Sequence, residues 1–520
     1  MKKTQKYKVG TKTVERQINY IPVRYIFAML ITIFEVLAII AVVVALCYFV
    51  PYFYIAAWIT QIACVISIIA SQDNPDYKIP WLLFVLIIPI GGFMLYLIFY
   101  SRKLKKKYVR RLNALKELKY SYDDTQELNE LKSLDPQAYA QAKMLKSTSG
   151  AHVFSDTGCV FYPLGENLME AMLKDLRDAE KFIYMEYFII EEGIFWNSIL
   201  EILKEKATQG VEIKVVYDDI GCMSTLPGNY AKELKRYGIE GVPFSRLRGS
   251  ADNEFNNRSH RKITVIDGKI GYTGGVNIAD EYINKVNRFG HWKDVGLRLE
   301  GKAVWELTRL FVTDFGINIK NPPVFNGELY PHAKGEGGGF VVPFGDGPRP
   351  LYNHRVAKTL ILTMLYTAQK SVYLVTPYFI VDNELAAAIE NTALRGVEVT
   401  LCVPHIPDKK LVFNMTRSFY PRLMSAGVRV FEYTPGFVHA KMYVVDSKYA
   451  FVGTVNLDYR SLVHHFENGV WMYGSQTVAD VEADIINTLE KSEEINKSTI
   501  KTTLFGRLMR SIVKIFAPML

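Results

Sequence analysis

The stretches "SHRKITVIDGKIGYTGGVN", residues 259–277, and "VHAKMYVVDSKYAFVGTVN", residues 438–456, place polar residues in the same arrangement on apolar strands. Each copy has a histidine, then a lysine two positions later, then a β-branched apolar run typical of a buried strand. Residues two apart in a strand point to the same face. The pattern therefore predicts two imidazole–ammonium pairs, His260 with Lys262 and His439 with Lys441.

Each of these strands ends at an aspartate that begins a turn, seven positions after the histidine. Asp267-Gly268 is a hairpin-turn signal, and the returning strand leads to Asn277 in the first copy and Asn456 in the second. Seven is an odd offset, so Asp267 and Asp446 point away from the histidine face. We expect these two carboxylates to fix the turn or to form a salt bridge rather than to attack a substrate.

The chain repeats itself around the two stretches. "AEKFIYMEYFII" (179–190) resembles "AQKSVYLVTPYFIV" (368–381), and "GVEIKVVY" (210–217) resembles "GVEVTLCV" (396–403). Strands that alternate with helical stretches predict an α/β fold with mostly parallel sheets. Duplication of the whole unit predicts two pseudo-symmetric lobes. We expect the lobes to span residues 151–340 and 341–500.

The predicted site suits a phosphodiester. A buried lysine is costly unless negative charge lies beside it. A pseudo-two-fold axis would bring two histidines, two lysines and two asparagines around one cleft. One neutral imidazole can then attack phosphorus while the other, protonated, gives its proton to the leaving alcohol. The lysines and asparagines would meet the charge on the phosphoryl oxygens.

The N-terminal part predicts a membrane anchor over residues 1–100. Three apolar segments, 25–49, 52–70 and 79–100, each approach the roughly 20 residues needed to cross a bilayer. The basic stretch that starts at residue 101 and the basic tail before residue 25 both favour the cytoplasmic side, which requires an even number of crossings. Either the middle segment does not cross the membrane fully, or the shorter N-terminal tail lies on the opposite side despite its basic residues. We expect two or three transmembrane helices in a multi-pass protein of the cell membrane, with the catalytic lobes on the cytoplasmic side.

Bulk properties narrow the class of partner. A formal charge of +9 favours an anionic partner, either nucleic acid or acidic lipid. The five cysteines have no metal-like spacing, so we interpret them as free thiols. Residues 101–150 are charged and are predicted to link the membrane and globular parts. Residues 501–520 form a predicted basic amphipathic helix that favours contact with the membrane.

Both stretches match the signature H-x-K-x4-D-x6-G-[S/G/T]-x-N of the phospholipase D superfamily. Together with the N-terminal spans, "NRSHRK", "GGVNIADEY" and "HWKDVGLRLEG", they make the chain resemble bacterial cardiolipin synthases over almost its whole length. The resemblance implies that two phosphatidylglycerol molecules give cardiolipin and free glycerol, without a metal ion or an organic cofactor. It also implies membrane phospholipids, and no nucleic acid, as partners.

The resemblance further implies roles for particular residues. His260 would be the nucleophile that becomes a phosphatidyl-histidine, and His439 would act as acid and then as base. Downstream carboxylates would brace the histidines, and Asp294 and Glu467 stand at suitable separations. Position 275 is glycine where many members of the superfamily have serine, so a hydroxyl donor to phosphate would be missing on the first side.

Other readings and weaker candidates stay open at the level of sequence. The chain could instead be a phospholipase D-type hydrolase or another phosphatidyltransferase, and, with less support, a membrane-tethered nuclease or a non-catalytic scaffold. Asp218-Asp219 resembles a metal-binding carboxylate pair, but we expect a solvated loop there. His464-His465 also suggests a metal, although adjacent residues in an extended segment point to opposite faces. The sequence leaves the oligomeric state open.

Overall fold

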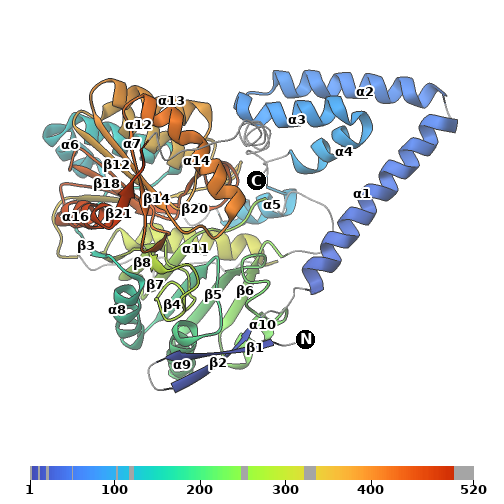
Figure 1. Ribbon diagram of the computed structural model, residues 1–520. Helices are drawn as coiled ribbons and strands as arrows, with labels where there is room; N and C mark the ends of the chain where they lie inside the picture. Colours follow the sequence, from blue (N-terminus) through green and yellow to red (C-terminus); the bar gives the residue numbers. More distant parts are fainter. Residues whose placement is uncertain are drawn as a thin grey trace.

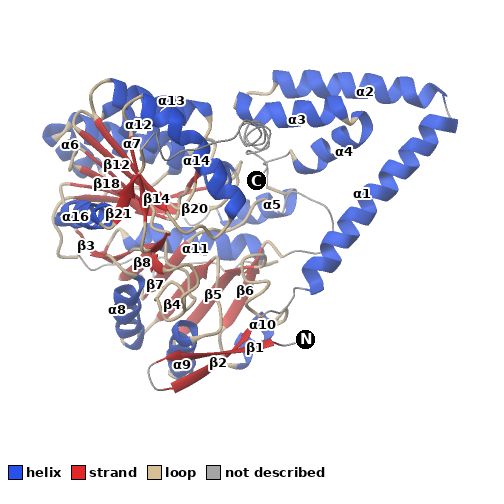
Figure 2. Cartoon of the chain, viewed as in Figure 1, coloured by secondary structure: helices blue, strands red, loops and turns tan. Residues whose placement is uncertain are grey.

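The computed structural model describes residues 3–9, 12–18, 23–49, 51–100, 104–115, 122–246, 256–320, 329 and 335–496. The predicted amphipathic helix at 501–520 lies outside the described residues. A two-stranded antiparallel hairpin, β1 (Lys3–Val9) and β2 (Lys12–Ile18), precedes the membrane region. Two large sheets with flanking helices make up the globular body (Figures 1 and 2).

The first lobe is built on a seven-stranded sheet. Its strands, in spatial order, are β3 (Thr157–Tyr162), β10 (Gly296–Gly301), β8 (Ile270–Gly274), β7 (Lys262–Ile266), β4 (Phe182–Tyr187), β5 (Glu212–Asp218) and β6 (Glu240–Phe244). Its helices are α8 (Gly165–Arg177), α9 (Ile194–Thr208), α10 (Tyr230–Arg236) and α11 (Val304–Asn318).

The second lobe repeats this order strand for strand and adds one strand at its edge. Its sheet contains β11 (Phe340–Asp346), β20 (Glu467–Tyr473), β18 (Tyr449–Gly453), β17 (Met442–Val445), β12 (Ser371–Val375), β14 (Glu398–Pro404), β15 (Arg429–Tyr433) and β21 (Ser492–Glu494). Its helices are α12 (Val356–Thr367), α13 (Asn383–Leu394), α14 (Lys410–Ser425), α15 (Tyr459–Val463) and α16 (Gln476–Glu490). The short strands β13 (Phe379–Ile380) and β19 (Leu457–Asp458) pair beside it.

The predicted α/β class and the duplication are confirmed, but the sheets are mixed rather than mostly parallel. Only the helix-connected strands run parallel, β4-β5-β6 in the first sheet and β12-β14-β15 in the second. The motif strand turns back on itself as an antiparallel hairpin, β7-β8 or β17-β18, and two further antiparallel strands extend that edge. The motif strands also pair antiparallel with β4 and β12, and β21 pairs antiparallel with β15 at the opposite edge. Hairpin connections force antiparallel pairing, whereas helical crossovers permit parallel pairing.

The two sheets share one apolar core. Buried residues of both sheets form a single cluster with the inner helices α11 and α16, which contact strands of both lobes. The outer face of each sheet has its own cluster under α8–α10 or under α12–α14. Figure 1 shows α11 between the sheets. This layering fixes the lobes against each other, so residues of both can meet at one site.

Residues 101–150, interpreted from sequence as a linker, contain three helices, α5 (Lys106–Ala114), α6 (Thr125–Leu134) and α7 (Pro136–Ser149). Asp135 caps α7 by accepting hydrogen bonds from the backbone amides of Gln137 at 2.8 Å and Ala138 at 3.2 Å. The buried face of α7 packs on α12 and β11. α7 therefore adds a layer to the second lobe, whereas α5 packs on α11 of the first lobe.

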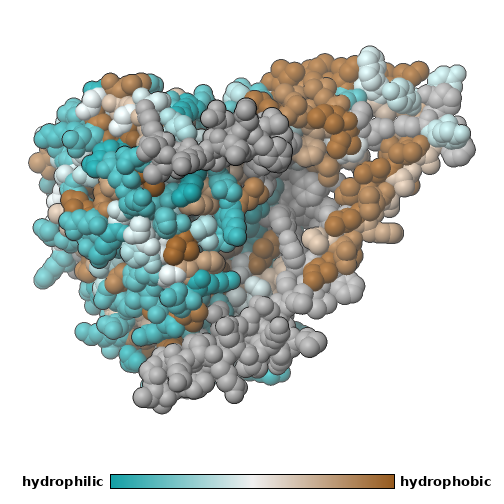
Figure 3. Space-filling view, viewed as in Figure 1, coloured by the Kyte–Doolittle hydropathy of each residue, from teal (hydrophilic) through white to brown (hydrophobic). Residues whose placement is uncertain are grey.

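Two helices of the N-terminal region are long and apolar enough to cross a membrane, α1 (Val23–Phe49) and α2 (Pro51–Ala70). The third apolar segment is divided into two short helices, α3 (Pro75–Ile87) and α4 (Pro89–Phe99). Figure 3 shows the apolar surface concentrated on these four helices, whereas polar side chains cover much of the two lobes. The N-terminal apolar helices agree with association with a membrane.

Candidate active site

The segment that leads into each motif histidine pairs with a segment of the opposite lobe. The strand before His439, β16 (Gly436–Val438), pairs in parallel with β9 (His291–Lys293) of the first lobe. The amide of His439 donates to the carbonyl of Lys293 at 2.7 Å. In the same way, Ser259 bridges to Phe466, and the amide of His260 donates to the carbonyl of Phe466 at 2.8 Å. The two half-sites therefore meet at the boundary between the lobes, with approximate two-fold symmetry.

The bracing carboxylates are exchanged between the lobes. His260 Nδ1 lies 3.0 Å from Glu467 Oε2, and His439 Nδ1 lies 2.6 Å from Asp294 Oδ2. Both carboxylates are fully buried. The structure thus brings together the histidines and the carboxylates that the sequence singled out, with each pair formed across the lobe boundary. The expectation that each histidine is braced by a carboxylate downstream of it is wrong for His439, because its partner Asp294 precedes it in the chain. A carboxylate on Nδ1 fixes the ring orientation and leaves Nε2 for chemistry.

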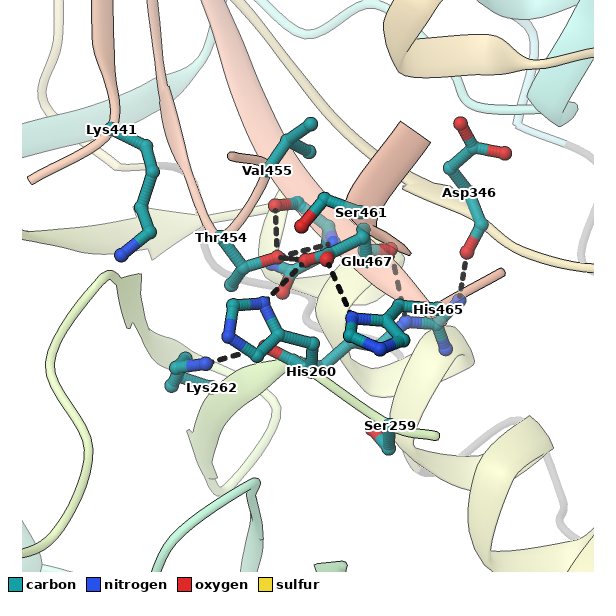
Figure 4. A network of polar contacts seen from close by, with 12 residues as sticks. Ser259, His260, Lys262, Asp346, Lys441, Thr454, Val455, Ser461, His465 and Glu467 are labelled. Carbon is teal, nitrogen blue, oxygen red and sulfur yellow. Dashed lines mark hydrogen bonds and ion pairs between the residues drawn. The ribbon is translucent and has the colours of Figure 1, made fainter. Parts of the chain in front are cut away.

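The two lysines lie close to the histidines. Lys262 Nζ donates to the carbonyl of His260 at 2.7 Å, and Lys441 Nζ lies 2.9 and 3.1 Å from the two ring nitrogens of His439. Figure 4 shows Lys441 extending from its strand toward His260 and Lys262. Burial and repulsion from Lys441 lower the pKa of Lys262 to about 7, and burial lowers the pKa of Lys441 to about 8. The repulsion shows that the two ammonium groups lie close enough to act together as one positively charged centre beside the histidines.

The resting imidazoles are neutral. Burial lowers the pKa of His260 to about 3 and that of His439 to about 4, although the adjacent carboxylates act in the opposite direction. Burial alone would raise the pKa of Glu467, but attraction to His260 and His465 outweighs burial and keeps that pKa well below its usual value. The site at neutral pH therefore holds neutral rings beside ionised carboxylates, and an incoming phosphate would raise the pKa of both rings.

The two half-sites differ at the small residues that follow each hairpin. A Cβ atom at Gly275 would lie 2.0 Å from Asp294 Oδ1, so the glycine makes room for the carboxylate. At the equivalent position, the Thr454 hydroxyl donates a hydrogen bond to Glu467. Neither position offers a spare hydroxyl to phosphate, because the first lacks one and the second is bonded to the brace. Glycine at position 275, where many members of the superfamily have serine, thus accompanies an aspartate brace, whereas threonine at position 454 accompanies the longer glutamate brace.

The two signature asparagines also differ. Asn277 accepts a hydrogen bond from the amide of Ile189 at 3.0 Å and donates to the Tyr282 hydroxyl at 2.8 Å, so its side chain holds local structure. Asn456 is buried, and its Oδ1 has no hydrogen-bond partner among the described residues. Only the second asparagine therefore has a side-chain oxygen without a protein partner in the described part of the chain.

His465 was named from the sequence only as a weak metal candidate, and its place beside His260 was not predicted. Its ring lies 5.5 Å from that of His260, and Trp292, at the equivalent place, lies 5.5 Å from His439. Both residues stand two positions before the bracing carboxylate, and this shared offset was the available signal. The extended segment expected at His464-His465 is instead a turn and a bend that follow α15, and the His464 ring lies 5.7 Å from that of Tyr77.

One group of side chains has the spacing of a metal site. Ligand atoms of His260, His465 and Glu467 lie within 4.8 Å of one another. Glu467 Oε2 already meets His260 and the Thr454 hydroxyl, so a metal ion would compete with the brace itself. Metal-independent catalysis stays a prediction, and the chelator experiment below tests it.

The predicted solvated loop at Asp218-Asp219 is wrong. Asp218 is fully buried and accepts hydrogen bonds from Arg258, at 2.8 Å from Nη2, and from the amide of Ser259 at 3.0 Å. An apolar strand places this carboxylate at its carboxyl end, where the arginine neutralises it. The pair anchors the segment that leads into His260.

Asp267 and Asp446 fix the turns at the far ends of the motif strands, as the sequence predicts. Both have left-handed backbone conformations, with φ of 54° and 55°. Asp267 accepts hydrogen bonds from three successive backbone amides, 180–182, at 2.7–2.9 Å. Asp446 does the same for amides 369–371 at 2.7–3.1 Å. These carboxylates fix the hairpin to the neighbouring strand rather than to the imidazoles.

Replacing Asp446 with alanine is expected to lower stability by on the order of 2 kcal/mol, because three backbone donors lose a charged acceptor. Thermal unfolding of the purified protein measures this loss. Lys269→Ala, an exposed change at the equivalent turn, is the matched control with an unchanged Tm. Activity per folded molecule should stay near that of the parent. A large loss of activity without a loss of stability would show that the carboxylate acts in the chemistry.

The two lobes have the same spatial order of strands, apart from one added edge strand, and their imidazoles pair at the lobe boundary. These features define a phospholipase D-like protein. A solved structure described as the phosphatidylserine synthase of Haemophilus influenzae Rd KW20 shares this fold, with a TM-score of 0.54, 16% identity, and coverage of 73% of this chain and 97% of that one. The family model described as "Cardiolipin synthase, PLD-like domain" matches residues 172–288 and 361–489, and one described as "Phospholipase_D-nuclease N-terminal" matches 59–99.

Curated relatives narrow the assignment further. The chain is 33% identical over 468 residues to a cardiolipin synthase of Alkalihalophilus pseudofirmus, covering 88% of this chain and 91% of the relative. It is 31% identical to that of Halalkalibacterium halodurans, covering 89% and 92%. An uncharacterised protein of Streptococcus mutans serotype c is 39% identical, covering 88% and 100%. The chain belongs to the cardiolipin synthase family.

Proposed function

We propose that this protein is a membrane-bound phosphatidyltransferase that makes cardiolipin and glycerol from two molecules of phosphatidylglycerol. The observation that carries the proposal is the pair of imidazoles, each braced by a buried carboxylate of the opposite lobe, around two buried lysines. Such a site provides a nucleophile, a proton donor and positive charge for one phosphodiester. The similarity to cardiolipin synthases supports the choice of lipid.

In the first half-reaction, His260 Nε2 attacks the phosphorus of one phosphatidylglycerol. The bond from phosphorus to the headgroup oxygen breaks, and protonated His439 gives its proton to that oxygen as glycerol leaves. Lys262 and Lys441 offset the negative charge that builds on the phosphoryl oxygens. The product is a phosphatidyl-histidine, and His439 is left neutral.

In the second half-reaction, His439 takes the proton from a headgroup hydroxyl of a second phosphatidylglycerol. That oxygen attacks the phosphorus, the bond from phosphorus to His260 breaks, and cardiolipin forms. The same ring thus acts as acid and then as base, as microscopic reversibility requires. The 2.6 Å contact of His439 with Asp294 suits the ring that must carry a proton.

The test uses purified full-length protein in vesicles that contain phosphatidylglycerol labelled in the headgroup and in the acyl chains, with and without a chelator. Labelled cardiolipin and free glycerol are expected in equal amounts, and the chelator is expected to change neither. Phosphatidic acid without cardiolipin would show a hydrolase, and cardiolipin that vanishes with the chelator would show a metal requirement. Added serine or ethanolamine that forms a new lipid would show another acceptor.

A further inference from the structure

The helices α3 and α4 form a hairpin whose two ends lie together. The Tyr100 hydroxyl, just after α4, donates a hydrogen bond to Asp73, just before α3, and the Tyr100 ring lies 5.5 Å from that of Tyr77. Near the turn, a Cβ atom at Gly92 would lie 2.0 Å from the carbonyl oxygen of Phe84. The glycine therefore allows α4 to fold back closely along α3.

Neither helix of the hairpin is long enough to cross a bilayer. With 13 and 11 residues, α3 and α4 are about 20 and 16 Å long at 1.5 Å per residue, against a hydrocarbon core of about 30 Å. Each reaches roughly through one leaflet. α1 and α2, by contrast, satisfy the length and composition of a span.

The turn of the hairpin is apolar and exposed. Leu86, Ile87 and Ile88 are 57%, 73% and 44% exposed. The amide of Ile88 donates to Phe84 and its carbonyl accepts from Gly92, while Pro89 has no amide hydrogen. Few polar backbone groups are thus left at the turn, which suits a hydrocarbon surrounding.

The base of the hairpin is polar and is docked on the second lobe. Asn74 Nδ2 donates to Asp382 at 2.9 Å, and the amide of Asn383 donates to Asp76 at 2.6 Å. The Tyr459 hydroxyl donates to Asp76 at 3.4 Å. The base and the catalytic lobes therefore lie on the same side of any membrane that the hairpin enters.

We propose that α3 and α4 form a re-entrant hairpin, with its turn among the acyl chains of the leaflet that faces the catalytic lobes. α1 and α2 are then the only crossings within the N-terminal region, so the N-terminus and the lobes share one side. This arrangement satisfies both basic flanks, which each favour the cytoplasmic side. It also holds the segment of His464 and His465 near the membrane surface. The proposal does not depend on which lipid the enzyme uses.

The test attaches a membrane-impermeant maleimide to single cysteines in right-side-out and inverted membrane vesicles. Gln72→Cys lies before the base of the hairpin, Leu394→Cys reports the second lobe, and Tyr52→Cys reports the turn between α1 and α2; all three side chains are exposed. The parent chain, in which Cys64, Cys222 and Cys402 are buried and Cys159 is partly buried, is labelled in parallel and its signal is subtracted as the background. Each variant is first checked for activity equal to that of the parent.

The expected result is labelling of Gln72→Cys and Leu394→Cys in inverted vesicles only, and of Tyr52→Cys in right-side-out vesicles only. Gln72→Cys and Leu394→Cys labelled from opposite sides would overturn the proposal, because the segment would then be a third span. A spin label at Ile87→Cys measures depth independently. It should be reached by oxygen and not by a water-soluble relaxation agent, whereas a label at Leu394→Cys should show the reverse. A water-exposed Ile87 label would also overturn the proposal.

Discussion

Replacing His260 or His439 with alanine is expected to reduce the rate of cardiolipin formation by roughly 1,000-fold or more, because each half-reaction needs both rings. The two variants should differ in what accumulates. Without His260 no phosphatidyl–enzyme bond can form. Without His439 the ring of His260 can still attack slowly, but the leaving glycerol has no proton donor. Acid quenching after brief exposure to acyl-labelled lipid, followed by peptide mapping, measures the adduct.

His405→Ala is the matched control, because His405 is a partly exposed histidine paired with Glu432 and is not part of the site. Its activity should remain near that of the parent. Adduct mapped to His439 rather than His260 would reverse the assignment of roles. Activity of His260→Ala or His439→Ala equal to that of the control would remove both rings from the mechanism.

Removing the charge of either brace is expected to lower kcat by roughly 100- to 10,000-fold, since the ring loses its orientation and its stabilised imidazolium. The variants are Glu467→Gln and Asp294→Asn, and Glu482→Gln, a surface change, is the control. Because the braces are exchanged, the variant in the second lobe should impair His260 of the first. Rapid-quench kinetics with the adduct as readout separate the two half-reactions.

The pH dependence of kcat tests the roles independently. Each carboxylate raises the pKa of its histidine, so an amide in its place lowers that pKa. The nucleophile must be neutral, so Glu467→Gln should move the acidic limb of the profile to lower pH. The general acid must be protonated, so Asp294→Asn should move the alkaline limb to lower pH. Interchanged effects would show that His439 is the nucleophile.

Much of the fold follows from local pattern. The β-branched runs, the Asp267-Gly268 turn and the repeated "GVE" strands predicted the elements and their duplication, because each signal is set by residues close in sequence. The sequence was a poorer guide to whether the strands at the sheet edges pair parallel or antiparallel. Helix–strand alternation suggested parallel strands, but two strands per lobe join through the hairpin edge, where pairing is antiparallel.

The sequence predicted which residues form the candidate site better than it predicted which of them pair with one another. His260, Lys262, His439 and Lys441 follow from strand parity, and the two bracing carboxylates from resemblance. Which lobe supplies which brace depends on the pairing of β9 with β16, a tertiary contact without a local signal. The place of His465 beside His260 was not predicted for the same reason, since the two residues are distant in sequence.

The exchanged braces make the two halves chemically inseparable. An isolated first half would have an imidazole at position 260 without a counter-charge, and a carboxylate at 294 without a ring to hold. Any single-lobed forerunner would have needed a second copy of itself before it could work. Within one polypeptide the two halves need not be identical, and the tryptophan beside His439 and the histidine beside His260 are one such difference.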